Sequence, residues 1–261
     1  MSAFLSAAQL RQFRQDGYLV LPAMVSPDVC ADIRAVAQDH LLRALPPLEY
    51  EAEVGYSGAP SSLDAPGGGT VRRLQGAWQR ADALRAWAED ARIVASMEQL
   101  LEEPVALTLA HHNCVMTKHP RYGTATGWHR DIRYWRFVRN ELVTVWLALG
   151  EEHAENGALR VIPGSHRFDI KPEQLDALDF LRPDAAENEV LFAQGITVLL
   201  HAGDVLLFHS GLFHAAGPNS QNEVKMSVAF AYRGRSNLPL DGSRSAAGGD
   251  VPLGAIDALG D

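Results

Sequence analysis

Short apolar segments separated by turns follow one another from Val105 onward, and this pattern restricts the fold more than any other feature. In the segment 142–149, residues Val143 to Leu149 alternate between two faces, as expected of a β-strand buried on both sides. Further strands are expected at 105–109, 114–118, 158–162, 196–200, 205–208 and 224–233. Many short strands with Gly, Pro and Asn turns predict a mainly β protein with flanking α-helices, built as an antiparallel two-sheet barrel.

Helical patterns precede this β region. Ser26-Pro27-Asp28 is a strong helix start, because it combines an N-cap residue, a proline at the first helical position and an acid in the first turn. This helix is expected to run to about Leu42, with further helices at 6–15, 82–88 and 91–101 and a strand at 18–21. We expect a single domain over 1–261, with a helical N-terminal part (about 1–104), a barrel (about 105–235) and a loose tail (236–261).

Residues 45–70 contain prolines and glycines that interrupt any regular element, including Gly67-Gly68-Gly69. A loop of this length within a compact domain is usually functional or disordered. It is either a lid over a pocket or a surface insertion, and the sequence favours neither.

The composition excludes several classes of partner. The formal net charge of −9 argues against nucleic acid or an acidic membrane surface. The two cysteines, Cys30 and Cys114, imply no disulfide framework and suit a reducing compartment. The N-terminus lacks the basic and apolar regions of a secretion signal, and no apolar run approaches the length of a membrane span. These features predict a cytoplasmic protein.

The last predicted strand has two unlike faces. Its even-numbered residues, from Val224 to Tyr232, are bulky and suit a sheet packed beneath helices. The opposite face reads Lys225, Ser227, Ala229, Ala231. Small residues with one cation make a poor core, and we interpret this face as the floor of a site for an anionic ligand.

His129 and Asp131 are two residues apart, a spacing that places both side chains on one face of a strand. An imidazole and a carboxylate that converge in this way can hold two corners of a metal, and one more histidine completes the triad of non-haem Fe(II) oxygenases. The tripeptide alone is weak evidence, because it also occurs by chance in exposed loops. Of the remaining histidines, His214 stands out, since it follows a strand and precedes the strand of Lys225.

Several motifs in a fixed order resemble the phytanoyl-CoA dioxygenase-like (PhyH) family, which includes ectoine hydroxylase. The resemblance implies a double-stranded β-helix (jelly-roll) barrel and an Fe(II)- and 2-oxoglutarate-dependent dioxygenase, and it extends to about Arg233. The matching residues are Phe13 to Val20, Trp128-His129-Arg130-Asp131, Asn156 to His166, Gly203-Asp204 and His214.

The resemblance implies His129, Asp131 and His214 as metal ligands, because the family places the distal histidine after the Leu-Phe pair, which excludes His209. The cofactors implied are Fe(II), 2-oxoglutarate and O2. The presence of Asp131 disfavours halogenation, since related halogenases lack this carboxylate.

The resemblance also implies a binding site for 2-oxoglutarate. The family's cosubstrate-binding arginine aligns with Lys225, which keeps the positive charge but loses the two-pronged hydrogen bonding of a guanidinium. Ser227, on the same face, is expected to donate a second hydrogen bond. Trp146, Lys118 and Cys114 match the remaining cosubstrate positions.

Arginines and aromatic residues alternate just after the metal motif. Arg133, Tyr134 and Trp135 are candidates for contacting an anionic or amphipathic small-molecule substrate. Alternatively, the arginines form a solvated basic edge.

We therefore expect a dioxygenase that hydroxylates a small molecule and releases succinate and CO2. A non-catalytic or altered-cosubstrate metal-binding protein on the same fold is the alternative suggested by Lys225. A jelly-roll metalloenzyme with another reaction is a third possibility, which the small, cationic face of the last strand disfavours.

Overall fold

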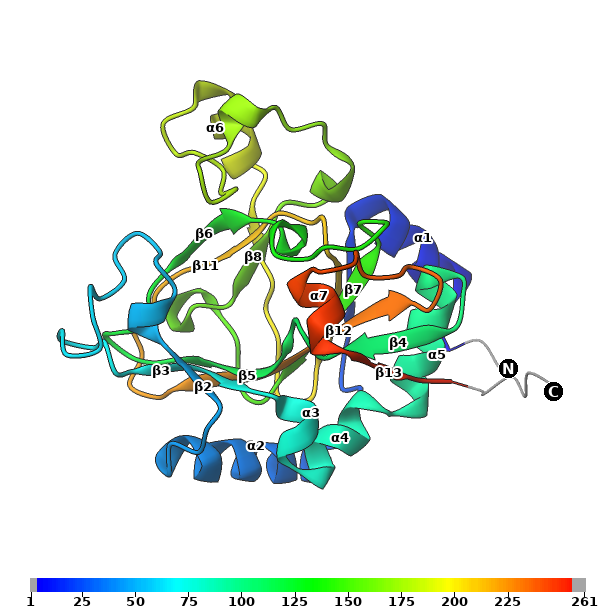
Figure 1. Cartoon of the computed structure of the whole chain (residues 1–261), viewed down its shortest axis with the longest axis horizontal. Helices are drawn as coiled ribbons and strands as arrows, with labels where there is room; N and C mark the ends of the chain where they lie inside the picture. Colours follow the sequence, from blue (N-terminus) through cyan, green and yellow to red (C-terminus); the bar gives the residue numbers. More distant parts are fainter. Residues whose placement is uncertain (1–3, 255–261) are drawn as a thin grey trace.

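Two antiparallel sheets form the centre of the computed structural model, which describes residues 4–254 (Figure 1). The larger sheet has nine strands in the order β1-β10-β7-β12-β5-β3-β2, with β4 beside β12 and β13 beside β4. The smaller sheet has the order β6-β11-β8-β9. The strands are β1 (Tyr18–Leu21), β2 (Leu48–Tyr50), β3 (Val71–Gln75), β4 (Val105–Thr108), β5 (Asn113–Lys118), β6 (Thr126–His129), β7 (Leu142–Ala148), β8 (Leu159–Val161), β9 (Ile196–Thr197), β10 (Val205–His209), β11 (His214–Ala216), β12 (Lys225–Gly234) and β13 (Asp250–Pro252).

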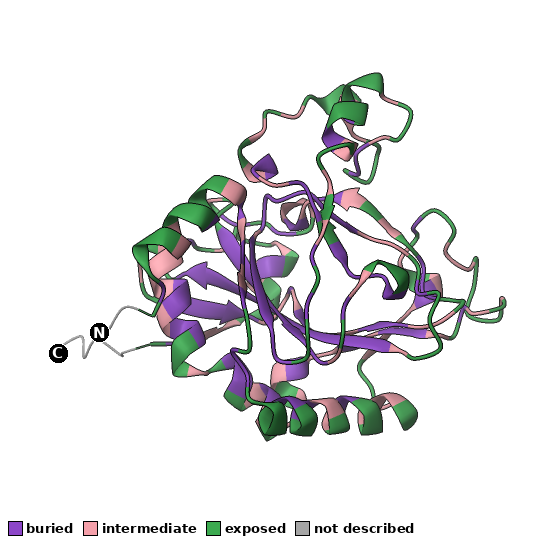
Figure 2. Ribbon diagram, turned by 180° about the vertical axis from the view of Figure 1, so that it is seen from behind, coloured by how far each residue is buried: buried purple, intermediate pink, exposed green. Residues whose placement is uncertain are grey.

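The helices within residues 7–101 cover the outer face of the larger sheet and turn their exposed sides to solvent (Figure 2). The start of α2 is as predicted: the Ser26 side chain accepts a hydrogen bond from the Val29 amide, and Pro27 takes the first helical position. No helix in residues 4–254 is both long and apolar enough to cross a membrane. The helices are α1 (Ala7–Asp16), α2 (Pro27–Leu42), α3 (Ala77–Arg80), α4 (Asp82–Ala88), α5 (Ala91–Leu101), α6 (Ala186–Phe192) and α7 (Arg244–Gly248), with short 3-10 turns η1 (Glu51–Glu53), η2 (Asp131–Arg133), η3 (Ala154–Asn156), η4 (Ser165–Arg167) and η5 (Pro172–Gln174).

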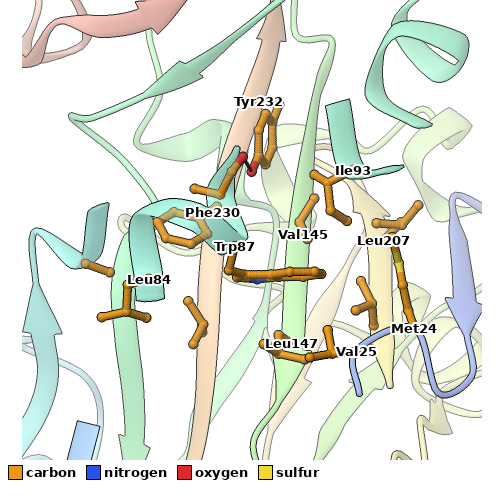
Figure 3. Close-up of a cluster of buried hydrophobic side chains, with 14 of the residues drawn as sticks. Met24, Val25, Leu84, Trp87, Ile93, Val145, Leu147, Leu207, Phe230 and Tyr232 are labelled. Carbon is orange, nitrogen blue, oxygen red and sulfur yellow. Dashed lines mark hydrogen bonds between the residues drawn. The ribbon is translucent and has the colours of Figure 1, made fainter. Parts of the chain in front are cut away.

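The main hydrophobic core lies between these helices and the larger sheet (Figure 3). Trp87 of α4 and Ile93 of α5 belong to the same buried cluster as Phe230 and Tyr232 of β12. The Tyr232 hydroxyl, fully buried, donates a hydrogen bond of 2.7 Å to the carbonyl of Ala88. A buried hydroxyl without such a partner would cost roughly 1–3 kcal/mol. The bulky face predicted for the last strand is therefore the core face.

The opposite face of β12 forms a floor between the two sheets. Lys225 pairs directly with Lys118 of β5, and Ala229 lies between Cys114 of β5 and Trp146 of β7. Because side chains alternate along a strand, small residues on this face leave space above the floor. Of this face, Lys225 lines a cavity, whereas Ala229 and Ala231 belong to buried apolar clusters, so its role as a ligand floor stays a prediction.

Two parts of the chain are more regular than their composition suggested. Strands β2 and β3 were not expected in the N-terminal part, where 18–21 was the one expected strand, and β3 extends the main sheet next to β5. In the expected loose tail, β13 pairs with β4, and Arg233 forms an ion pair of 2.6 Å with Asp250. Residues 236–254 therefore do not form the loose tail that was expected. Residues 255–261 lie outside the described residues.

Candidate metal centre

Three potential metal ligands meet where β6 and β11 pair. His129 ends β6 and His214 begins β11, and the two residues are register partners whose ring centroids lie 4.2 Å apart. Asp131 lies beyond the end of the strand and opens the turn η2, so its carboxylate reaches the histidines through a turn and not, as expected, along the strand. Ligand atoms of all three residues lie within 4.8 Å of one another, and all three side chains are buried.

Backbone carbonyls select the metal-binding tautomer of both histidines. Nδ1 of His129 lies 2.9 Å from the carbonyl oxygen of Gly127, and Nδ1 of His214 lies 3.0 Å from that of Leu212. A carbonyl only accepts, so each Nδ1 carries the proton and each Nε2 offers a lone pair. Burial lowers the pKa of both imidazoles, which keeps them neutral. This donor set fits a divalent iron in a site with two histidines and one carboxylate.

Asp131 is held as a carboxylate by its neighbours. Burial raises the pKa of its carboxyl, but the nearby His112, which also hydrogen-bonds to it, lowers the pKa, and the net shift is below the ordinary value. His112 Nε2 lies 3.2 Å from Oδ1, and the Thr144 hydroxyl donates to Oδ2 at 3.3 Å. Nothing in the sequence pattern singled out His112 or Thr144 for this role, because His112 lies in the turn before β5 and Thr144 lies on β7, and neither is a neighbour of Asp131 in sequence.

His209 is not part of this centre. Its Nδ1 accepts a hydrogen bond of 2.9 Å from the Gly211 amide, and its ring lies 5.1 Å from that of His166. Within residues 4–254, the three residues His129, Asp131 and His214 form the one group of His, Cys, Asp and Glu side chains that meets a metal-site geometry.

A cavity of about 480 Å³ opens from the metal ligands over the floor of the larger sheet. Four of the five predicted cosubstrate residues line it: Cys114, Lys118, Trp146 and Lys225. Ser227 does not, because it is fully buried and its hydroxyl donates to Glu152 at 2.5 Å. In this arrangement the Ser227 proton is not available for a bound carboxylate.

Lys118 is a buried cation that takes part in no ion pair within the described residues. Its Nζ donates to the Thr124 carbonyl at 2.6 Å, and burial followed by the nearby Arg72 lowers the pKa of Lys118 to about 7. The aliphatic stem passes between two glycines: a Cβ at Gly123 would lie 3.0 Å from its Cδ, and one at Gly157 would lie 3.2 Å from its Cε. These glycines leave room for the lysine to reach the cavity.

Two of the three predicted substrate residues line the same cavity. Tyr134 and Trp135 line it, whereas the Arg133 guanidinium packs 3.8 Å from the ring centroid of Phe180 and is not among the lining residues. Tyr56 also lines the cavity, and its hydroxyl lies 2.8 Å from that of Tyr134.

The segment expected to be a lid or an insertion supplies part of this wall. Glu49 and Tyr56 come from residues 45–70, and the neighbouring Arg73 of β3 forms an ion pair of 2.6 Å with Glu49. This contact with the cavity favours a functional role for the segment.

A sequence model of the family described as phytanoyl-CoA dioxygenase (PhyH) matches residues 13–227, well over half of the chain. The chain belongs to this family. Ectoine dioxygenase of Halomonas elongata is 26% identical over 250 residues, covering 89% of this chain and 71% of the relative.

Solved PhyH-like structures share the fold. EctD from S. alaskensis with 2-oxoglutarate and 5-hydroxyectoine has a TM-score of 0.74 at 23% identity, covering 91% and 79% of the two chains. The non-heme alpha ketoglutarate dependent epimerase SnoN from nogalamycin biosynthesis has a TM-score of 0.69 at 26% identity, covering 87% and 82%. Family membership and the metal-ligand geometry together confirm the predicted fold and the predicted class, an Fe(II)- and 2-oxoglutarate-dependent dioxygenase.

We expect His214→Ala to weaken Fe(II) binding at least about a hundredfold, because it removes one of three protein ligands. His209→Ala is the matched control, since it removes a half-buried imidazole close in sequence but outside the cluster. Anaerobic equilibrium dialysis against Fe(II) measures both. Equal affinity in His214→Ala and the unmodified protein would contradict the assignment.

Proposed function

We propose that this protein hydroxylates a small molecule at an iron centre held by His129, Asp131 and His214. The observation that carries the proposal is the buried group of three ligands: each histidine offers its Nε2 lone pair, and Asp131 offers a carboxylate oxygen. The three residues line a cavity that two lysines also line. Iron with 2-oxoglutarate and O2 supplies the oxidising power for C–H hydroxylation, with succinate and CO2 as coproducts.

The lysines suit the distal carboxylate of 2-oxoglutarate. Lys118 and Lys225 are direct partners on neighbouring antiparallel strands, an arrangement in which like charges repel. Lys225 is paired with Glu152 at 3.1 Å, so the pair of lysines together with Glu152 carries one net positive charge when Lys118 is protonated. One carboxylate bound between the lysines neutralises that charge. Trp146 and Cys114 complete this part of the wall.

Other residues of the cavity wall suit the substrate. Arg73 donates one of its five N–H groups to Glu49. It lines the cavity together with Tyr56, Tyr134 and Trp135. A guanidinium among aromatic rings favours an anionic or amphipathic small molecule, as predicted, although Arg73 is among the arginines that line the cavity and Arg133 is not.

The cytoplasmic location expected from the sequence stays a prediction, supported by two cysteines that are both free thiols and buried.

Succinate release tests the proposal. Fe(II)-loaded protein with 2-oxoglutarate and O2 should form succinate. When small carboxylates and amino-acid derivatives are added one at a time, the rate of succinate formation should rise with any compound that is a substrate. Asp131→Ala removes the ligand carboxylate and should abolish succinate formation above the iron-free background. Iron-loaded protein that forms no succinate with any compound would support the alternative, a non-catalytic metal-binding protein.

The affinity for 2-oxoglutarate should depend on the protonation of Lys118. With a pKa of about 7, this lysine is charged below neutrality and loses its charge as the pH rises. The anaerobic dissociation constant should therefore increase up to about tenfold per pH unit above 7. Lys118→Arg, which keeps its charge throughout, should flatten the profile. If the dissociation constant of Lys118→Arg depends on pH as in the unmodified protein, another group causes the pH dependence.

A further inference from the structure

Glu152 is a carboxylate buried behind the cavity wall. It follows β7, and its side chain is 0% exposed and does not line the cavity. Its amide donates to the carbonyl of Leu200 at 2.8 Å, and its carbonyl accepts from the Leu200 amide at 3.1 Å, which fixes its backbone. A charged side chain at such a position is costly unless it is paired and hydrogen-bonded.

Three side chains of the cosubstrate region donate to this one carboxylate. Lys225 Nζ lies 3.1 Å from Oε2, while the Ser227 hydroxyl and the Trp146 indole lie 2.5 Å and 3.0 Å from Oε1. Lys225 also lies 5.2 Å from the centroid of the Trp146 ring. Glu152 therefore ties β7 to β12 at the place where both strands face the cavity.

We propose that Glu152 is a positioning residue for 2-oxoglutarate, one that holds the Lys225 ammonium and the Trp146 indole in place without touching the cosubstrate. This inference rests on the proposed function. A lysine carries a compact charge on a flexible stem, so its position must be set by a partner. Lys225 also stands beside the like charge of Lys118, and Glu152 on its far side offsets that repulsion.

The donors at Lys225 are consistent with this role. An ammonium has three N–H donors, and two of those of Lys225 point to Glu152 and to the Ser227 oxygen, at 3.1 Å and 3.3 Å. The third is left for the cavity that Lys225 lines. The Ser227 hydroxyl in turn donates its hydrogen bond to Glu152, so Ser227 supports the position of Glu152 and does not bind the ligand.

A double-mutant cycle tests whether Glu152 acts through Lys225. Fe(II)-loaded protein is titrated anaerobically with 2-oxoglutarate, and the visible charge-transfer band of the chelate reports binding. We expect Glu152→Gln to weaken 2-oxoglutarate binding about tenfold and Lys225→Met at least as much. The double variant should bind no more weakly than Lys225→Met alone. Iron affinity and the band at saturation should not change. Glu155→Gln, an exposed glutamate in the same loop, is the matched control and should behave as the unmodified protein.

Each other outcome overturns the inference in a distinct way. Tighter 2-oxoglutarate binding in Glu152→Gln would mean that Glu152 competes with the ligand for Lys225. If the losses of 2-oxoglutarate affinity add in the double variant, Glu152 acts independently of Lys225. If Glu152→Gln binds 2-oxoglutarate as well as the unmodified protein, Glu152 has no positioning role. No band in the unmodified, iron-loaded protein would overturn the proposed function as well.

Ser227→Ala provides a second test if Glu152→Gln does not fold. This change removes a donor to Glu152 at a residue that does not line the cavity. It should weaken 2-oxoglutarate binding in the otherwise unmodified protein and add nothing in Lys225→Met. Unchanged binding in Ser227→Ala would contradict the anchoring network.

Discussion

The antiparallel pairing of β6 with β11 is the constraint on which the site depends. It makes His129 and His214 register partners, and the turn after β6 returns Asp131 to the same point. The backbone carbonyls of Gly127 and Leu212 then fix both imidazole tautomers. A shift of one residue in this register would turn one histidine to the other face of the smaller sheet.

Strand β12 connects this centre to the core. Its outer face contributes Phe230 and Tyr232 to the cluster beneath the helices, and its inner face brings Lys225 to the cavity wall and packs Ala229 beside Trp146. A bulky residue at position 229 would press on Cys114 and Trp146, which line the cavity. The same strand therefore stabilises the fold through one face and leaves room for ligands on the other.

Local pattern predicted most of the fold. Helix α2 and strand β1 have the expected bounds, because capping residues and alternation are local signals. Strands β2 and β13 escaped prediction, since three residues among glycines and prolines show no periodicity and are held by pairing with distant strands.

The sequence predicted those residues of the candidate site that belong to motifs. It missed the residues that only tertiary contacts bring to the site. His129, Asp131 and His214 have a characteristic spacing and order. Glu152 and His112 have neither, because their partners lie 73 residues (Lys225) and 19 residues (Asp131) away along the chain. From the sequence, a carboxylate on a loop is predicted to be exposed, and only the fold shows that Glu152 is buried beside a lysine.

A crystal structure of the protein with 2-oxoglutarate and Mn(II), a redox-inactive substitute for Fe(II), tests the central claim most directly. We predict Mn(II) bound to Nε2 of His129, Nε2 of His214 and a carboxylate oxygen of Asp131. The distal carboxylate of 2-oxoglutarate should lie within hydrogen-bond distance of Lys118 and Lys225, with Glu152 still bound to Lys225. A metal held by other residues, or a cosubstrate carboxylate away from both lysines, would contradict the account.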